Sequence, residues 1–560
     1  MEQPTDPSAN GVPPPFWRRT EVLILAALLA TLAAPFLLQG KETTAPARYD
    51  RRLVVLSPHN ERVRQEFGHA FARLWKARTG ETLYLDWRIP GGSTEIAMFL
   101  RSEYSGAFQY FWEHGQNREW SPAMAGAFAN SRTAITGTDA SAEARREFLA
   151  SHVGIGVDLL FGGGSYDFQQ YAEAGYLVAG SVAPPVGPVG VMERHPGWFG
   201  DAAIPVRVGG EPFRDPEGRW VGVVLASFGI VYNRDVLRRL DIPAEPTQWR
   251  DLADPRLSGQ VALADPTKSG SVAKAFELMI QQQMHQAVDQ AGAGREAEGI
   301  RQGWERGFRL IRHISGNARY FTDSAAKIPL EVARGDAAAG MAIDSYGRSA
   351  EEYVRRADGG SRVGFVAPLG GTSVSVDPIG LLRGAPEPEL ATAFIEFVLS
   401  PVGQKLWAFR PGTPGGPEHT ALRRLPVRRD FYTAENRAFM SDGREDPYQH
   451  AESFTYRPEW TGPMFGALRF LIRVACIDTH REQRDAWRAL LANGFPPPAL
   501  AVFDDMAGAS YDEALHTIAP VLKAKDKVAE VRLARELAER FRARYRQAAD
   551  LARAGGPRHE

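Results

Sequence analysis

Residues 51–90 hold two short apolar runs separated by an amphipathic segment, and this alternation limits the fold more than any other feature of the chain. The apolar runs at 53–56 and 83–87 predict strands, because each is short and rich in branched or aromatic side chains. Between them, Phe67 and Phe71 fall on one face of a helix. A strand, a helix and a strand in succession predict a parallel sheet with helices on its faces, and therefore an α/β fold.

The same alternation continues to about residue 432. It includes one or two strands at 221–233 and another at 261–264, where the apolar run VALA ends before Asp-Pro. Two segments interrupt it: residues 104–153 are rich in aromatic side chains, and residues 179–220 are rich in glycine and proline. We treat both as insertions, and the first is a candidate lid over a binding site.

Residues 433–560 predict a helical C-terminal extension, because strand patterns stop there. The last helix, at about 526–553, is highly charged but places Leu537, Phe541 and Tyr545 on one stripe. We expect this helix to lie on the folded protein rather than to form a coiled coil.

The N-terminus has the pattern of an export signal. A polar, proline-rich leader at 1–20 contains two arginines, residues 22–38 are apolar and uncharged, and a polar linker follows at 40–50. The pattern predicts a signal peptide or a transmembrane anchor at 21–39, with the leader in the cytoplasm. Residues 48–560 would then lie outside the cytoplasmic membrane, in the periplasm or its equivalent, whether the signal is cleaved or kept as an anchor.

Composition excludes several classes of protein. The formal net charge is −1, so no general basic field points to a nucleic-acid partner. Cys476 is the only cysteine, which excludes an intramolecular disulfide and a zinc or iron–sulfur site built from cysteines. No cysteine follows the apolar run, so a lipoprotein anchor is also excluded.

The chain lacks the common catalytic motifs. We find no HExxH, GxSxG or Walker loop and no cysteine–histidine pair for nucleophilic catalysis, so we expect a protein that is not an enzyme. The chain contains 67 aspartate and glutamate residues, and a secreted carbohydrate-active enzyme that uses two carboxylates therefore stays as an alternative.

A serine- and glycine-rich helix start is the first candidate binding site. Residues 263–276 read LADPTKSGSVAKAF, so Ser269, Gly270 and Ser271 open a helix directly after a buried strand. Free backbone N–H groups and the positive end of the helix dipole suit an anion there. A plain N-cap by Ser269 is the alternative.

Other strand ends carry similar residues. Ser93, Thr94 and Glu95 open a helix after two glycines, and a third glycine-rich turn, GGGS, follows the strand near 161. Polar residues at these ends would face a cleft at the carboxyl edge of the sheet. From these two turns and the end of the first strand we take the following candidates: His59, Asn60, Ser93, Thr94, Glu95, Gly164 and Ser165. For His59 a packing role is the alternative.

An ordered series of motifs extends over about residues 51–432. It comprises VVLSPHNE, IPGGSTEI, DLLFGGGSYDF, GIVYNRDVL, WRDLADPRLSGQVALADPTKSGS, SVDPIGLL and LSPVGQKLW. Together these segments resemble the extracellular solute-binding proteins of ATP-driven importers, in the group called the ferric-iron type. The resemblance implies a two-lobed periplasmic-binding-protein fold of type II, with a ligand in the cleft and closure about a hinge.

The resemblance also implies how the lobes are divided. Lobe 1 would hold 51–222 and 372–432, and lobe 2 would hold 226–370. The chain would cross between them near Ser227 and Ser373, and Ser227 would face the cleft. The partners would be a membrane permease and its ATPase.

Two ligand classes stay open, and a third hypothesis requires no ligand. Ferric binders of this family carry two adjacent tyrosines, whereas AIDSYGRSAEEY holds only Tyr346. Relatives without the pair take sugar phosphates or phosphonates, and Asp344 or Glu95 would then meet an amine or a hydroxyl of such a ligand. Ferric iron bound through Tyr346 is the alternative, as transported cargo, and no resident cofactor is expected. A protein that kept the fold for interaction or sensing, without a ligand, is the third reading.

Overall fold

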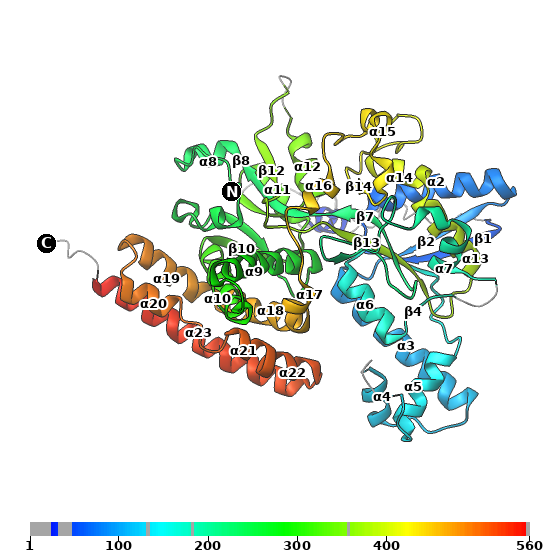
Figure 1. The fold of residues 1–560 in the computed structure, drawn as a ribbon, viewed down its shortest axis with the longest axis horizontal. Coiled ribbons are helices and arrows are strands. Elements are labelled where there is room, and N and C mark those ends of the chain that lie inside the picture. The colour runs from blue at the N-terminus through cyan, green and yellow to red at the C-terminus, as the bar shows by residue number, and fades with distance from the viewer. Residues whose placement is uncertain (1–23, 32–47, 130–134, 181–183, 356–358, 556–560) are drawn as a thin grey trace, which may run out of the picture.

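The computed structural model describes residues 24–31, 48–129, 135–180, 184–355 and 359–555, and it contains two α/β lobes that lie side by side (Figure 1). Each lobe is built around one mixed sheet. The expected α/β fold with two lobes is therefore confirmed. The predicted anchor at 21–39 lies outside the described residues except for a helix at 24–31. No helix in the described ranges is long and apolar enough to cross a membrane.

The sheet of lobe 1 has the order β14-β7-β13-β3-β1-β2, with β4 paired to β13. Strand β1 runs parallel to β2, as the opening motif predicted, and also parallel to β3, whereas β13 runs antiparallel to β3 and β7. Its strands are β1 (Arg51–Leu56), β2 (Leu83–Arg88), β3 (Leu159–Phe161), β4 (Leu177–Val178), β7 (Val221–Ala226), β13 (Ser375–Leu382) and β14 (Leu425–Pro426).

The helices of lobe 1 enclose an aromatic core. Phe67 and Phe71 of α2 pack against Phe394 and Phe397 of α13 and against Trp407 of α14. Its helices are α2 (Glu61–Thr79), α3 (Ser93–Tyr110), α4 (Pro122–Ala129), α5 (Ala140–Ala150), α6 (Ser165–Ala174), α7 (Gly187–Arg194), α13 (Pro388–Leu399) and α14 (Pro401–Ala408).

The sheet of lobe 2 has the order β10-β9-β11-β8-β12. Its strands are β8 (Phe228–Asn233), β9 (Val261–Ala264), β10 (Ala318–Thr322), β11 (Ala339–Ile343) and β12 (Val363–Val366). Its helices are α8 (Arg234–Arg239), α9 (Gly270–Ala291), α10 (Glu296–Gly316), α11 (Lys327–Arg334) and α12 (Asp344–Tyr353). Helices α9 and α10 touch closely, because a Cβ at Gly303 would lie only 2.2 Å from the Cα of Met284.

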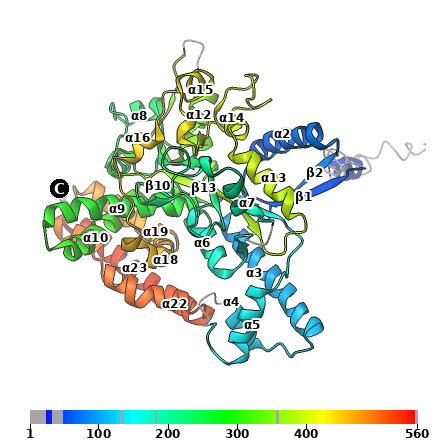
Figure 2. The same cartoon turned by 45° about the vertical axis from the view of Figure 1, so that its right-hand side comes forward.

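The chain passes between the sheets at two places near those expected. Ser227 separates β7 of lobe 1 from β8 of lobe 2, and the chain returns between β12 and β13. The two-stranded ribbon of β5 (Arg207–Val208) and β6 (Glu211–Pro212) lies in the predicted insertion at 179–220. The other insertion, 104–153, completes α3 and forms α4 and α5, which project from the foot of lobe 1 (Figure 2).

The C-terminal extension is helical, as predicted, but it divides between the lobes. Met440, Tyr448 and Ala451 pack into the core of lobe 1, with α15 (Ala434–Phe439) and α16 (Pro447–Ala451). From Phe454 onward the chain packs into the core of lobe 2. Its later helices are α17 (Pro458–Thr461), α18 (Phe465–Ile472), α19 (His480–Ala492), α20 (Pro497–Phe503), α21 (Tyr511–Glu513), α22 (Ala519–Lys523) and α23 (Lys527–Gly555).

Helix α23 closes the core of lobe 2 from the outside (Figure 1). The stripe predicted on this helix is buried, with Phe541 and Tyr545 fully enclosed. Their rings and that of Phe503 surround the guanidinium of Arg312 on α10, which is itself fully buried. Cation–π contacts, a hydrogen bond to the carbonyl of Asp505 and a 3.9 Å contact with the Sδ of Met506 surround this buried charge.

Candidate ligand-binding cleft

A cavity of about 560 Å³ lies between the two lobes. Its volume falls in the range of sites that hold small organic ligands, roughly 300–1,000 Å³. Most of the predicted site residues line it: His59, Ser93, Glu95, Gly164, Ser165, Ser269, Gly270, Ser271 and Tyr346.

Several helices begin at the wall of this cavity, α11 and α12 among them, and three others begin with the predicted serine and glycine residues. Helices α3 and α6 come from lobe 1, and α9 comes from lobe 2. Gly92 and Gly164 are the N-caps of α3 and α6, and neither offers a side chain to the first N–H groups. Those N–H groups have no hydrogen-bond partner within their own helices, so they can donate to an acceptor in the cavity. The positive ends of the three helix dipoles also lie at the wall and would favour a negative charge there.

Ser269 is both a cap and a wall residue. Its Oγ accepts from the N–H of Val272 at 3.4 Å, a long hydrogen bond, so the plain-cap interpretation is also realised. Directly after it, a Cβ at Gly270 would lie 3.3 Å from the Oγ of Ser93 and 3.4 Å from the Oδ2 of Asp167. The absence of a side chain at Gly270 thus lets the N-terminus of α9 approach lobe 1 closely.

Four predicted residues do not reach the wall. The side chain of Asn60 caps α2, and Ser227 is enclosed in the crossing between the lobes. The hydroxyl of Thr94 donates 2.8 Å to the carbonyl of Thr267 in the other lobe. Asp344 was expected to meet the ligand, but its carboxylate accepts from Arg348, 2.6 Å away and one turn later on α12, and is almost fully buried.

His59 combines packing with a place on the wall. Its ring packs edge-on against Phe161, and its Nε2 has no hydrogen-bond partner in the described chain. Burial, with a smaller effect of Arg424, holds the pKa of His59 well below its usual value, so the ring is neutral. Gly162 lies directly behind it with a φ of +93°, and a Cβ there would come within 2.4 Å of Nε2.

Lys274 is a cation of the cleft wall that pairs with two carboxylates, and it was not among the predicted site residues. Its Nζ lies 3.0 Å from Glu277 on the same helix and 3.0 Å from Glu211, which lies in β6 beside lobe 1. Burial opposes the charge, but the two carboxylates raise the pKa of Lys274 above its usual value. The ring of Tyr456, from the extension, lies 3.2 Å from the same Nζ.

The other charges of the wall nearly balance one another. Arg424 pairs with Asp377 at 2.8 Å, and Lys327 pairs with Asp323 at 2.6 Å. Lys268 is exposed at the mouth, and its side chain forms no ion pair or hydrogen bond with the part of the chain that the structure describes. Burial raises the pKa of Asp167, with Arg469 and Ser93 opposing the shift. The side chains of the wall therefore supply no excess of cations, so any preference for an anion would have to come from backbone donors.

Tyr346 is the one predicted iron ligand. Burial raises its pKa, which Arg424 partly offsets, and the Asn60 side chain bonds to its hydroxyl. Tyr166 and Tyr456 also line the cavity, but Tyr456 donates to Glu277 at 3.0 Å. A second tyrosine adjacent to Tyr346, as in the ferric binders, is not present in the sequence.

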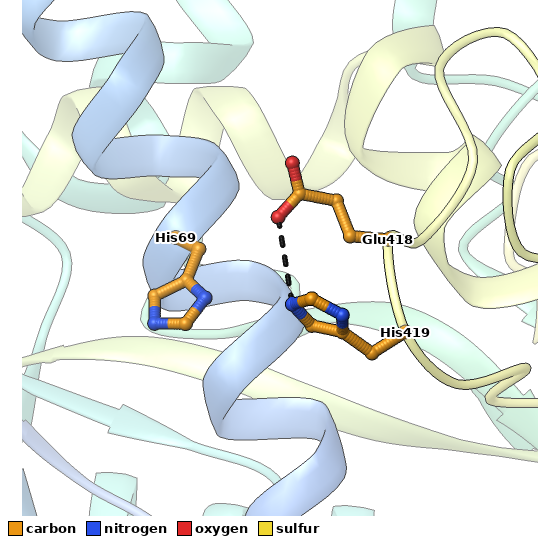
Figure 3. Close-up of side chains that lie close together, drawn as sticks. All are labelled: His69, Glu418 and His419. Carbon is orange, nitrogen blue, oxygen red and sulfur yellow. Dashed lines mark ion pairs between the residues drawn. The ribbon is translucent and has the colours of Figure 1, made fainter.

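One cluster of metal-ligand type occurs outside the cleft, in the part of the chain that the structure describes. His69 of α2 faces Glu418 and His419, with ligand atoms within 4.8 Å of one another (Figure 3). All three side chains are exposed, and Arg73 already pairs with Glu418 at 2.6 Å. The carboxylate is thus neutralised without an ion.

The insertion at 104–153 and the extension differ in their relation to the cleft. No described residue of the insertion lines the cavity, whereas Tyr456 and Phe465 of the extension do. Sequence reasoning missed both, because the resemblance ends near residue 432 and no local motif marks them.

Comparison with known families supports the resemblance. Residues 201–430 match the family model described as bacterial extracellular solute-binding protein. The phosphoglycerate transport regulatory protein PgtC of Salmonella typhimurium is 24% identical over 188 residues, which are 34% of this chain and 40% of that protein. The iron uptake protein A1 of Synechocystis is 27% identical over 206 residues, 35% of this chain and 50% of that protein.

The chain spans about half the length of the curated relatives it matches. Among solved structures, the periplasmic binding protein AfuA of Actinobacillus pleuropneumoniae, with exogenous fructose-6-phosphate bound, is 18% identical. That similarity covers 70% of this chain and 96% of AfuA, with a TM-score of 0.42.

Proposed function

We propose that this chain, an extracellular solute-binding protein by its fold and by the family match over residues 201–430, captures a small anionic solute outside the cytoplasmic membrane. The observation that carries the proposal is the meeting of three helix N-termini, from α3, α6 and α9, around one cavity between the lobes. Oriented N–H groups of this kind bind phosphate and other oxyanions without free cations.

The solute class that fits is an organophosphate or a phosphonate. Its phosphoryl oxygens would accept from the backbone at Ser93, Ser165 and Gly270, while its hydroxyl or amine groups would donate to Glu95 or Asp167. The relative named as a phosphoglycerate transport regulator supports this class.

The protein would act by binding alone. Closure of the lobes would bury the anion among backbone and hydroxyl donors, and the closed form would dock on a membrane permease driven by an ATPase. Helix α9 of lobe 2 and helices α3 and α6 of lobe 1 would move together in that step, since they share the ligand.

A second candidate is ferric iron bound through Tyr346. The place of Tyr346, Tyr166 and Tyr456 on the wall and the relative named as an iron uptake protein favour it. Against it, the second tyrosine that ferric binders carry beside Tyr346 is not present in this sequence.

A melting screen of the full chain tests the proposal. The probes are inorganic phosphate, glucose 6-phosphate, 3-phosphoglycerate, 2-aminoethylphosphonate, ferric citrate and glucose. A ligand at about 100 times its Kd stabilises the folded state by about 2.7 kcal/mol and raises Tm measurably. We expect a shift with at least one phosphorylated compound. A shift with ferric citrate alone, with a tyrosinate absorption band, would replace the proposal by the iron function, and no shift would favour a protein without a ligand.

A further inference from the structure

Helix α18 of the C-terminal extension reaches the mouth of the cleft and contacts both lobes there. Its Arg469 donates from Nε to the carbonyl of Pro266 at 2.8 Å and from Nη2 to that of Thr267 at 2.9 Å. The same Nη2 lies 3.4 Å from the hydroxyl of Thr94 in lobe 1. Arg469 thus holds the loop that leads into Ser269 and α9.

The first residue of α18, Phe465, lies on the cavity wall. Its ring packs against that of Tyr166, on α6 of lobe 1, with centroids 4.7 Å apart. Tyr456, also from the extension, lies over Lys274 and completes this side. The extension therefore supplies aromatic surface to a cavity whose remaining wall comes from the two lobes.

The cavity wall then combines two chemically different surfaces. The helix N-termini suit a phosphoryl group. The ring faces of Phe465 and of Tyr166, the second residue of α6, offer an inorganic anion no favourable contact. A cavity of about 560 Å³ also leaves much space beside a bare phosphate.

We infer that Phe465 and Tyr166 form an aromatic wall that contacts the carbon skeleton of the ligand, so that the extension makes the cleft select organic phosphates over inorganic phosphate. The inference rests on the proposed function. Ring faces pack against the C–H groups of a sugar or a short carbon chain, and they lose water on doing so. Arg469 is a positioning residue in this arrangement, because its hydrogen bonds to the loop at 266–268 fix the position of α18.

The test measures two dissociation constants on the full chain, for glucose 6-phosphate and for inorganic phosphate, by calorimetry. The wild-type protein is expected to bind glucose 6-phosphate at least about ten-fold more tightly. In Phe465→Leu, the Kd for glucose 6-phosphate should rise about five-fold while that for inorganic phosphate stays within about two-fold. Phe470→Leu is the matched control: Phe470 is equally buried on the same helix but does not line the cavity, so both constants should be unchanged.

A second variant guards against a folding defect, because Phe465 is almost fully buried. Tyr166 is 39% exposed, so Tyr166→Leu removes the partner ring without emptying a core. It should lower the same selectivity ratio. The inference is overturned if both ligands weaken equally in these variants, or if neither constant changes. If the wild-type chain binds neither phosphate, the proposed function itself fails, which is a different result from binding without selectivity.

Discussion

The hydroxyl of Thr94 in lobe 1 donates a 2.8 Å hydrogen bond to the carbonyl of Thr267 in lobe 2. The bond lies at the mouth of the cleft, where Arg469 also meets the carbonyl of Thr267. The structure therefore has its lobes in direct contact beside the cavity, and this contact must break when the lobes separate.

Replacing Thr94 by valine removes the hydroxyl and keeps the shape. The loss of one hydrogen bond costs about 1 kcal/mol, so we expect ligand to dissociate several-fold faster while its association changes little. Stopped-flow measurement with the phosphorylated ligand found in the screen gives both rates. Thr79→Val is the control, because the Thr79 hydroxyl donates to the carbonyl of Trp75 and accepts from the N–H of Glu81, away from the cavity wall. An unchanged dissociation rate in Thr94→Val would show that this bond does not hold the lobes together.

The double variant Ser269→Ala and Ser271→Ala tests the start of α9. We expect affinity for the anion to fall by about 1–3 kcal/mol, because two hydroxyls near a charged group are lost. Ser269 is also an N-cap, so some stability will be lost as well, about 1 kcal/mol. Ser400→Ala controls for that effect, since Ser400 caps α14, outside the cavity wall. Equal affinity in the double variant and the wild type would show that the anion does not bind at the start of α9.

Tyr346→Phe separates the two candidate ligands. If the ligand is an organophosphate, its affinity should change by less than about three-fold, because the aromatic ring remains and the hydroxyl that is lost already bonds to the side chain of Asn60. If the ligand is ferric iron, the variant should lose both the metal and the visible absorption of a tyrosinate complex. Titration with ferric citrate, followed by absorbance, distinguishes the cases.

The free energy of unfolding should decrease as the pH falls through the range in which the buried histidines titrate. Burial, with Arg484 adding to it, lowers the pKa of His480 to about 4, against about 6.5 in an unfolded chain. The unfolded state therefore takes up the proton first as the pH falls. The free energy of unfolding should be unaffected above about pH 6.5 and decrease below it, at up to about 1.4 kcal/mol per pH unit for each such group until its folded pKa is passed. The pKa values of His59, His285 and His450 are lowered in the same direction.

Denaturant unfolding of His480→Gln at several pH values checks this assignment. The variant should show a shallower decrease between about pH 6.5 and 4 than the wild type. His114→Gln is the control, because His114 is exposed on the surface. An identical slope in all three proteins would contradict a lowered pKa at His480.

Gly162→Ala should destabilise the protein more than its backbone conformation alone requires. Gly80 has a similar φ, +81° against +93°, but no atom lies within 4 Å of a Cβ there. Gly80→Ala thus measures the strain of a positive φ, about 1–2 kcal/mol. Gly162→Ala adds a collision with His59 and should cost at least about 1 kcal/mol more. Combining it with His59→Ala should remove the excess, which a double-mutant cycle measures.

The parts of the site that the sequence predicted are those with local signals. Ser93 and Ser269 stand at helix starts beside glycine, and a strand end followed by such a start is visible in the residues themselves. The strand predicted at 261–264 is β9, with the same bounds. Both the fold class and the resemblance followed from such short segments.

The parts that were missed depend on contacts between distant segments. Lys274 lies within α9, and nothing nearby in the sequence shows that Glu211 would approach it. Phe465 belongs to an extension with no motif of its own. Asp344 was expected in the cleft because it follows a strand, yet Arg348 four residues later binds its carboxylate. A local pattern gives the position of a polar residue, but its partner is decided by packing.

Residues near the C-terminus complete the core of lobe 2, and this has a consequence for how the chain is made. Phe541 and Tyr545 enclose Arg312, which is more than two hundred residues earlier in the chain. Until α23 has been synthesised, the apolar face of α10 and α19 stays uncovered, and Arg312 lacks two of its three ring contacts. Lobe 2 can therefore reach its final packing only after α23 has left the ribosome. During that interval the nascent chain exposes an apolar surface of the kind that makes folding intermediates prone to aggregation.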